Sequence, residues 1–263
     1  MGHQEIALRL QEFWEGEGCP TIPARGWLPA GGLSPEGFFG VLSDEPFSAC
    51  QEMSVVDLWL SPYGDDLLHP IIDRRLQVTL QVGSYDQRKR FVESLRALGL
   101  DVLVHDVRFV PRDEDRMPSE NMCWKVLVDR IEIGSLKRLR SLGGIALREE
   151  AQVVEYSLPR LAISLEDGGD GGSSSDRGEQ CATYAIHCAE PERIGSLFEL
   201  SAAECEGSLS CGLYRPAYEH ALYCIHLDSL LSQREQTSVW ERGARIEALI
   251  SGCAKAYLEA ADA

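Results

Sequence analysis

A succession of short strand-like runs constrains the fold of this chain more than any other feature. Residues 76–82 alternate apolar and polar side chains, which is typical of a half-buried strand. Further strand-like runs follow at 102–110, 124–133 and 136–139, and another lies near 153–156. Because these runs mostly follow one another directly, with helices mainly before and after them, they predict an α+β fold built on an antiparallel sheet.

Amphipathic helices are expected on both sides of the strand-rich region and within it. The apolar spacing of residues 6–14 predicts a helix that ends near Gly16, and the spacing of residues 91–98 predicts a helix that stops at Gly99. Another helix is expected from about Ser157, because the proline that follows is tolerated in a first helical turn. The predicted sheet is therefore flanked by helices.

Segments rich in glycine, proline and serine interrupt this pattern. Residues 20–47 are rich in glycine and proline and predict a long irregular segment, and Gly143-Gly144 predicts a turn. Residues 167–179 read DGGDGGSSSDRGE, which is typical of a flexible linker. Beyond this run, residues 217–231 and 238–258 have the spacing of helices.

The chain is accordingly expected to have two structured parts. Residues 1–166 form the sheet domain, residues 167–180 form the linker, and residues 181–263 complete the core and add a helical tail. A chain of 263 residues is long enough for this arrangement.

The net charge of −17 bears on which partners the chain can bind. Nucleic acids are bound by clustered lysine and arginine residues, so direct binding of a nucleic acid by this chain alone is not expected. Basic clusters do occur at residues 88–90 and 137–140. We interpret them as solvated faces that balance nearby acids, and a local anion-binding patch is the alternative.

The expected compartment is the cytoplasm. No apolar run approaches the roughly 20 residues that span a bilayer, and residues 1–10 lack the layout of a signal peptide. The chain contains nine cysteines without a CxxC pair, which favours reduced thiols over a disulfide framework. Zinc sites use closely paired ligands, so no metal is expected either.

Six motifs occur in one order along the chain. They are LQEFWEGEGC at 10–19, SLRALGLDVLVHDVRFV at 94–110, GGIAL at 143–147, EYSLPRLA at 155–162, PAYE at 216–219 and SVWER at 238–242. Together they resemble the α chain of the bacterial two-subunit glycyl-tRNA synthetase over nearly the whole chain. The resemblance implies a class II aminoacyl-tRNA synthetase fold, a homodimer formed through the first motif, and a partner β chain that supplies most of the tRNA recognition.

The sequence departs from this family where the family binds ATP. The paired arginines of the family correspond to Val56 and Asp57, and two further arginines correspond to Pro62 and His69. Class II synthetases need cations that hold the phosphates and stabilise charge in the transition state. No cofactor is therefore expected, and ATP with magnesium is expected only if the pocket has been rebuilt.

The amino-acid side of the family's site has changed as well. Two acidic positions of the family correspond to Ala146 and Val153, and Lys125 stands in place of an acid. A lysine near the ammonium group of glycine would repel that substrate. The resemblance and these departures together predict that the chain keeps the family's fold but no longer binds the family's usual substrates.

Some family-matched residues remain. Arg160, in EYSLPRLA, matches the arginine of the family's third class II motif, which normally contacts ATP. Asp106 and Arg108 match the HDIRF motif, and Trp124 and Glu132 match a strand of the family. The resemblance implies that these residues bind ligand. The alternative is a structural role in ion pairs, strand pairing and core packing.

Two adjacent arginines are new in the stretch that corresponds to the family's ATP site. Arg74 and Arg75 are candidates for a relocated anion site. The alternative is that they pair with Asp73 or with exposed acids.

Two hypotheses for function remain open. In the first, the chain is a pseudo-synthetase that no longer activates glycine and serves in binding or assembly, with a protein or an aminoacyl-tRNA as its partner. In the second, it is a repurposed enzyme that forms an amide or aminoacyl bond in a specialised biosynthetic pathway, with His69, Glu155 and Lys125 as candidate catalytic residues. A housekeeping α chain would need the missing arginines.

Overall fold

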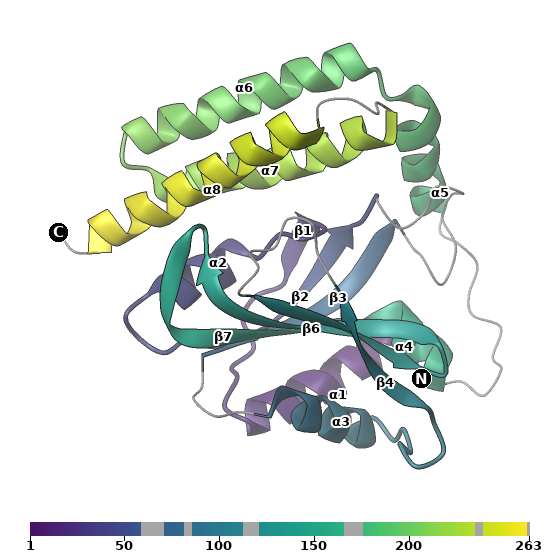
Figure 1. Ribbon diagram of the computed structural model, residues 1–263. Coiled ribbons are helices and arrows are strands. Elements are labelled where there is room, and N and C mark those ends of the chain that lie inside the picture. The colour runs from purple at the N-terminus through teal and green to yellow at the C-terminus, as the bar shows by residue number, and fades with distance from the viewer. Residues whose placement is uncertain (59–70, 82–85, 113–120, 166–175, 235–238, 262–263) are drawn as a thin grey trace.

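The computed structural model describes residues 1–58, 71–81, 86–112, 121–165, 176–234 and 239–261. In these ranges the chain forms a seven-stranded mixed sheet with helices on both faces (Figure 1). The strands are β1 Arg25–Pro29, β2 Ser48–Val56, β3 Ile72–Leu80, β4 Val107–Arg112, β5 Met122–Val128, β6 Ile131–Leu142 and β7 Ile145–Ser157. The helices are α1 His3–Gly16, α2 Pro35–Leu42, α3 Gln87–Ala97, α4 Leu158–Leu165, α5 Asp176–Thr183, the π-helix η1 Tyr184–Cys188, α6 Pro191–Ser210, α7 Tyr214–Arg234 and α8 Val239–Ala261.

The order of the strands confirms the predicted α+β sheet. It runs β1-β2-β3-β7-β6-β5-β4, and every pair is antiparallel except β1–β2, which is parallel. β5 and β6 form a hairpin whose turn residues, Asp129 and Arg130, have φ angles of 49° and 75°. Two such left-handed residues match the twist of paired strands. The turn predicted at Gly143-Gly144 joins β6 and β7 and is confirmed, with φ angles of 58° and 75°.

One face of the sheet is covered by α1, α3 and α4, and we call the core on this side the lower core (Figure 1). Its centre is aromatic: the rings of Phe91 and Tyr156 stack with their centroids 4.6 Å apart. The indole nitrogen of Trp14 donates to the hydroxyl oxygen of Tyr156 at 3.2 Å, and the hydroxyl groups of Tyr156 and Ser94 lie 2.6 Å apart. The lower core therefore satisfies its few buried polar atoms internally.

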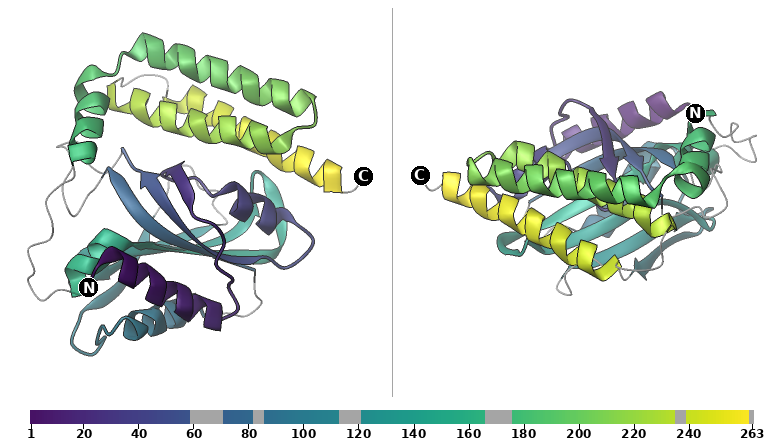
Figure 2. Two further views of the ribbon diagram at one scale, coloured as in Figure 1. Left: turned by 180° about the vertical axis from the view of Figure 1, so that it is seen from behind. Right: turned by 90° about the horizontal axis from the view of Figure 1, so that it is seen from above.

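The opposite face carries the C-terminal helices, and we call the core on this side the upper core. The helices α6, α7 and α8 lie above the sheet in both side views, and the view from above shows them running across it (Figure 2). Helix α2 also lies on this face, where Phe38 stacks on Tyr218 with centroids 4.2 Å apart. The predicted C-terminal helices are thus confirmed, and they share a continuous core with the sheet.

The prediction of an irregular segment over residues 20–47 is wrong in part. This segment contains the short edge strand β1 and the helix α2. The helix begins at a Ser-Pro pair: the hydroxyl oxygen of Ser34 accepts a hydrogen bond from the amide of Gly37 at 3.1 Å, and Pro35 occupies the first turn. Both features are standard signals of a helix start.

Three strand predictions also need correction. The run 124–133 contains two strands, because the hairpin turn lies within it. In the run 102–110, β4 begins only at Val107. The strand predicted at 76–82 is not half-buried, because Gln77 and Thr79 on its polar side are 2% and 3% exposed. Helix α2 and the polar groups described below cover that side.

The predicted linker over residues 167–180 lies mostly outside the described residues. Helix α5 begins at Asp176, inside the predicted linker, so the last part of that prediction is wrong. Along the described ranges, no helix is both long enough and apolar enough to cross a membrane.

Candidate functional site

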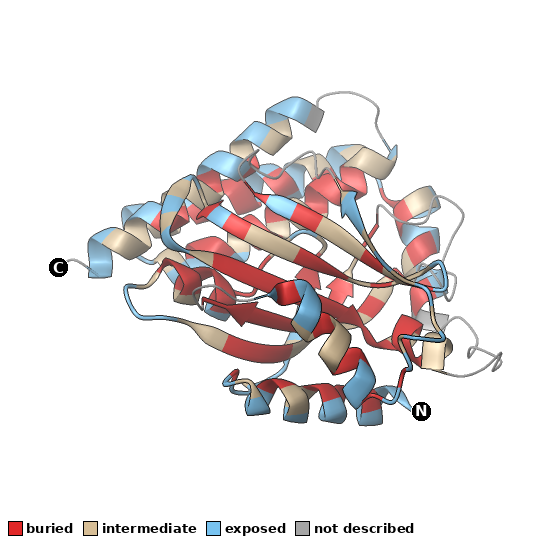
Figure 3. Ribbon diagram, turned by 60° about the horizontal axis from the view of Figure 1, so that its bottom comes forward, coloured by how far each residue is buried: buried red, intermediate tan, exposed pale blue. Residues whose placement is uncertain are grey.

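Charged side chains are buried on the upper face of the sheet, where β3, β7 and β6 lie side by side. Figure 3 shows that the middle of the sheet is buried. The register pairs Gln77 of β3 with Glu155 of β7, and Glu155 in turn with Ser135 of β6. Because side chains alternate between the faces of a strand, Asp73 and Arg75 share the face of Gln77. We call this group, with its partners below, the buried ion network.

Glu155 is surrounded by donors and cations. The amide nitrogen of Gln77 and the hydroxyl group of Ser135 each donate to its carboxylate at 2.9 Å. Lys137 Nζ lies 3.7 Å away and Arg75 Nη1 lies 3.9 Å away. Burial alone would raise the pKa of Glu155, but Lys137, Arg75 and the two hydrogen bonds lower it to about 2. Glu155, a candidate acid or base, is therefore a carboxylate with no proton to give at neutral pH.

Asp73 is fully buried between two arginines. Its carboxylate accepts hydrogen bonds from Arg75 Nε at 2.7 Å, from Arg160 Nη2 at 3.3 Å and from the hydroxyl group of Ser157 at 2.8 Å. Arg160 also donates through Nη1 to the backbone carbonyl of Glu132 at 2.9 Å. The guanidinium of Arg160, which is 3% exposed, is thus directed at groups of the protein itself.

Arg74 and Arg75 do not lie in one site. Successive residues of a strand point to opposite faces, and each arginine lies beside acids of its own. Arg74 pairs with Glu52, while Arg75 approaches Asp57 at 3.5 Å in addition to Asp73. Burial would lower the pKa of Arg75, but the nearby carboxylates raise it overall. The geometry is that of the alternative interpretation, in which these arginines pair with acids.

Lys125 and Glu132 form a half-buried pair beside the network. The ammonium nitrogen of Lys125 lies 2.8 Å from a carboxylate oxygen of Glu132. The backbone carbonyl of the same glutamate accepts from Arg160, so the pair adjoins the ion network through the main chain. The two family-matched residues Arg160 and Glu132 are therefore brought together.

The remaining family-matched residues lie toward the β4 edge of the sheet. Asp106 and Arg108 form an exposed ion pair at 2.6 Å. Trp124 of β5 lies below the guanidinium of Arg88, which is 4.9 Å from the ring centroid. These three residues do not contact the buried ion network. His69 lies outside the described residues and is not placed.

Asp73 and Lys137 are charged members of the network that are not among the candidate site residues predicted from sequence. The sequence offers Asp73 only as a partner of the arginines and Lys137 only as part of a solvated basic cluster. Neither is recognisable from composition, because what makes them neighbours of Arg160 and Glu155 is the strand register. The other two cations of the cluster, Arg138 and Arg140, both pair with Glu150.

The network does not fit a polyphosphate or a metal ion. Its arginines already donate to Asp73, and a phosphate beside them would face the carboxylates of Asp73 and Glu155. No group of three or more His, Cys, Asp or Glu residues within the described part of the chain is arranged to hold a metal. In this arrangement the cations of the network lie beside carboxylates of the protein itself.

Comparison with known proteins gives one family over nearly the whole length. The family model described as glycyl-tRNA synthetase alpha subunit matches residues 3–170 and 173–262. Among solved structures, the chain is similar to a pyrrolysyl-tRNA synthetase from Desulfitobacterium hafniense, at 12% identity and a TM-score of 0.43, over 61% of this chain and 67% of that chain. It is also similar to Giardia lamblia prolyl-tRNA synthetase in complex with prolyl-adenylate, at 11% identity and a TM-score of 0.45, over 62% and 45% of the two chains.

Proposed function

Since the chain belongs to the glycyl-tRNA synthetase alpha subunit family, we propose that it is a synthetase-derived protein that has lost ATP-dependent activation of glycine and serves as a binding or assembly protein. Two features support the proposal: the chain has the family's fold, and the charges at its site are already paired with one another.

The position of Asp73 against Arg160 carries the proposal. Arg160 matches the arginine that the family uses on ATP, and its guanidinium lies 3.3 Å from a carboxylate that is fully buried. An ATP phosphate at this arginine would have to displace Asp73 or lie beside it. Placing a second anion at a buried site of this kind is costly because neither charge can be solvated.

Two further changes support the same function. Asp57 stands where the family has one of its paired arginines, and its carboxylate lies 3.5 Å from the guanidinium of Arg75. The residue that replaced one cation of the family's site therefore neutralises the charge of Arg75. Lys125 stands in place of an acid and is paired with Glu132 at 2.8 Å. Both changes oppose the binding of the substrates that the family activates.

The competing hypothesis of a repurposed bond-forming enzyme has His69, Glu155 and Lys125 as its candidate catalytic residues. Glu155 has its pKa lowered to about 2, and Lys125 is held in an ion pair. That hypothesis therefore rests on His69, which lies outside the described residues.

A partner chain is part of the proposal. Members of this family work in a complex with a partner subunit, which the description "alpha subunit" implies. We propose a β-type chain as the partner, together with a homodimer of this chain. The net charge of −17 opposes direct tRNA binding by this chain alone, so any contact with an aminoacyl-tRNA would pass through the partner.

Calorimetric titration tests the proposed loss of activation. The purified chain is titrated first with ATP and then with a non-hydrolysable glycyl-adenylate mimic, beside a competent member of the same family as the positive control. We expect no binding heat with either ligand. A dissociation constant tighter than about 1 mM, or about 4 kcal/mol, would overturn the proposal.

The proposed assembly role has its own measurement. Light scattering during size-exclusion chromatography gives the mass of the chain alone and after mixing with the β chain of the same cell. We expect a mass of twice 29.1 kDa for the chain alone and a larger complex after mixing. A monomer that ignores the β chain would contradict the assembly role while leaving the calorimetric result intact.

A further inference from the structure

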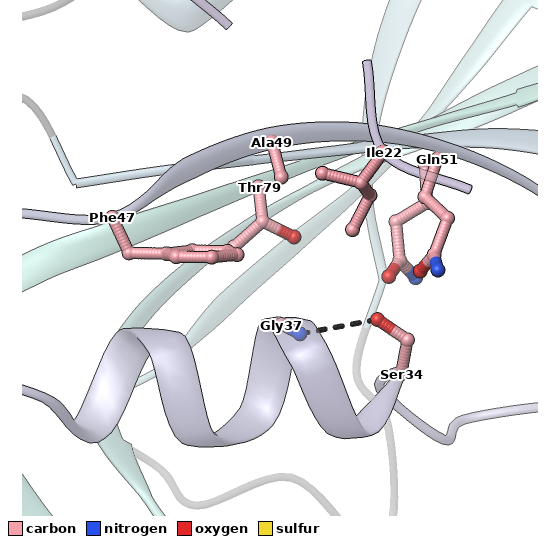
Figure 4. A pocket seen from close by; sticks show the side chains of 8 residues that line it. Ile22, Ser34, Gly37, Phe47, Ala49, Gln51 and Thr79 are labelled. Atoms are coloured by element: carbon pink, nitrogen blue, oxygen red, sulfur yellow. Dashed lines mark hydrogen bonds between the residues drawn. The ribbon is translucent and has the colours of Figure 1, made fainter. Parts of the chain in front are cut away.

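The space between β2, β3 and the first turn of α2 is too tight for a ligand. Figure 4 shows the side chains of Ile22, Phe47 and Gln51 lying directly over this helix, with Ser34 at its start. No room is left between them for even a water molecule. A partner on this side of the molecule would therefore contact the surface of the helices above the sheet.

Helix α6 carries two leucines on its exposed side. Leu197 and Leu200 are 42% and 65% exposed. In both side views α6 is the helix that lies farthest from the sheet (Figures 1 and 2). Phe198 and Cys205 of the same helix belong to the upper core, so the two leucines point away from it. Adjacent exposed apolar side chains on an outer helix favour contact with another protein.

Two charged residues continue the line of the leucines along the helix. The four residues, which we call the α6 seam, are Arg193, Leu197, Leu200 and Glu204. Their spacing of four, three and four residues places them on one face, as at the a and d positions of a coiled coil. All four are exposed. Neither Arg193 nor Glu204 has an ion-pair partner among the residues that the structure describes.

The α6 seam is complementary to itself. Its spacing is the same when it is read from either end, so the seam of a second copy can lie antiparallel to it about a two-fold axis. Arg193 then faces Glu204 of the second copy, and Leu197 faces Leu200 of the second copy. The symmetry produces each of these contacts twice. A parallel arrangement would instead place the two copies of Arg193 against each other, and likewise the two copies of Glu204.

Small residues beside the α6 seam allow a second helix to approach closely. Ser196, Ala203 and Gly207 lie along one side of it and are exposed. A Cβ atom added at Gly207 would meet nothing within 4 Å, so the backbone there is open. Short side chains favour small distances between helix axes. This side of the seam also carries no charge, so the net charge of −17 on each copy is not concentrated at the contact.

We propose that the α6 seam binds the same seam of a second copy of this chain in the antiparallel orientation. The inference rests on the homodimer proposed above and names its surface. It differs from the contact through the first motif that the family resemblance implies. A seam of about three helical turns lies at the low end of interface sizes, so we expect a dissociation constant in the micromolar range.

An exchange of the two charges tests the orientation. Sedimentation equilibrium of the full-length chain between about 1 and 100 µM gives the dissociation constant of the dimer. Arg193→Glu and Glu204→Arg each place like charges opposite each other twice in one dimer, and we expect each to raise the dissociation constant about fivefold or more. The double variant restores opposite charges with their places exchanged. We expect its dissociation constant to lie within about twofold of the wild-type value.

The leucines are expected to contribute more than the charges. Leu200→Glu brings an unpaired charge into the middle of the contact, and we expect it to raise the dissociation constant about tenfold or more. Leu8→Glu is the matched control. Leu8 of α1 is 59% exposed, close to the 65% of Leu200, and α1 lies on the other side of the sheet. We expect this control to leave the dissociation constant unchanged.

The measurements separate the seam from the homodimer itself. A wild type that stays monomeric at every concentration would contradict both. A dimer that Leu200→Glu does not weaken would overturn the seam and leave the homodimer with its contact elsewhere. A double variant as weak as the single variants would overturn the antiparallel pairing.

A partner chain on the same surface is the other outcome to distinguish. Leu200→Glu and the wild type are therefore also mixed with the β chain of the same cell. We expect both to form the larger complex. If Leu200→Glu loses this complex and still forms the homodimer, the α6 seam is a contact for the β chain and the inference is wrong.

Discussion

The two faces of the sheet bury different kinds of side chain. On β7, Val154 and Tyr156 point into the lower core, whereas Glu155 and Ser157 point to the upper face and into the ion network. The lower core is apolar and needs only a few internal hydrogen bonds. The network buries several paired charges. Buried ion pairs often stabilise a protein no more than apolar side chains of the same volume would.

This difference distinguishes the buried groups that the fold requires from those that it does not require. Helices on a sheet require an apolar layer such as the lower core. No packing rule requires Asp73 between Arg75 and Arg160. We interpret the network as a former binding surface whose charges now pair with one another. Four measurements test this difference between the two faces.

The largest effect is expected from Asp73→Ala. The substitution leaves Arg160 buried with no carboxylate, and breaking a buried ion pair in this way costs about 3–5 kcal/mol. Urea denaturation of the variant gives the change in the free energy of unfolding. A loss below about 1 kcal/mol would show that the network does not hold the upper face together.

The second effect is a dependence of stability on pH. The folded-state pKa of Glu155 is lowered from 4.5 to about 2, so its stabilising contribution is present above pH 4.5 and is lost as the pH falls through 2. A shift of this size corresponds to about 3 kcal/mol. Denaturation curves of the wild type and of Glu155→Gln between pH 5 and 2 should converge as the pH falls. Parallel curves would contradict the lowered pKa.

A smaller loss is expected in the lower core from Tyr156→Phe. The change removes one hydroxyl group and leaves Trp14 Nε1 and the hydroxyl group of Ser94 without this partner. Each unsatisfied buried group costs about 1–3 kcal/mol, and Ser94 keeps its bond to the carbonyl of Phe91, so we expect about 1–2 kcal/mol. Thermal denaturation measures it. A loss as large as that of Asp73→Ala would remove the contrast between the two faces.

The smallest effect is expected at the edge of the sheet. Asp106→Ala breaks an ion pair with Arg108 that is exposed on both sides. Exposed pairs contribute little because water and salt screen them. We expect an unchanged midpoint of urea denaturation. A clear loss of stability would mean that this family-matched pair has a structural role that its exposure does not suggest.

Elements with a clear hydrophobic period were predictable from sequence. The spacing of apolar residues identified α1, α3, α7 and α8. Strand β1 was not predicted, because it has only five residues and includes a glycine and a proline. Helix α2 was not predicted, because its sequence PEGFFGVL is buried on nearly every side and shows no polar face. Its Ser-Pro start was nevertheless a usable signal of a helix.

The site was predictable only as a set of residue types. Glu155 was a candidate acid or base, but its partners Lys137 and Arg75 come from neighbouring strands on either side. Their closeness depends on register, which a single sequence does not reveal when the facing residues are charged.

The distribution of the two cores along the chain has a consequence for synthesis. Every buried residue of the lower core lies between Ile6 and Ala162, whereas the upper core needs residues as late as Ala254. Ribosomes release the N-terminal part of a chain first, so the lower core can close while α7 and α8 are still being made. Until those helices emerge, the apolar part of the upper face is open to water on the nascent chain. During synthesis the nascent protein therefore exposes this apolar face to solvent after the lower core has closed.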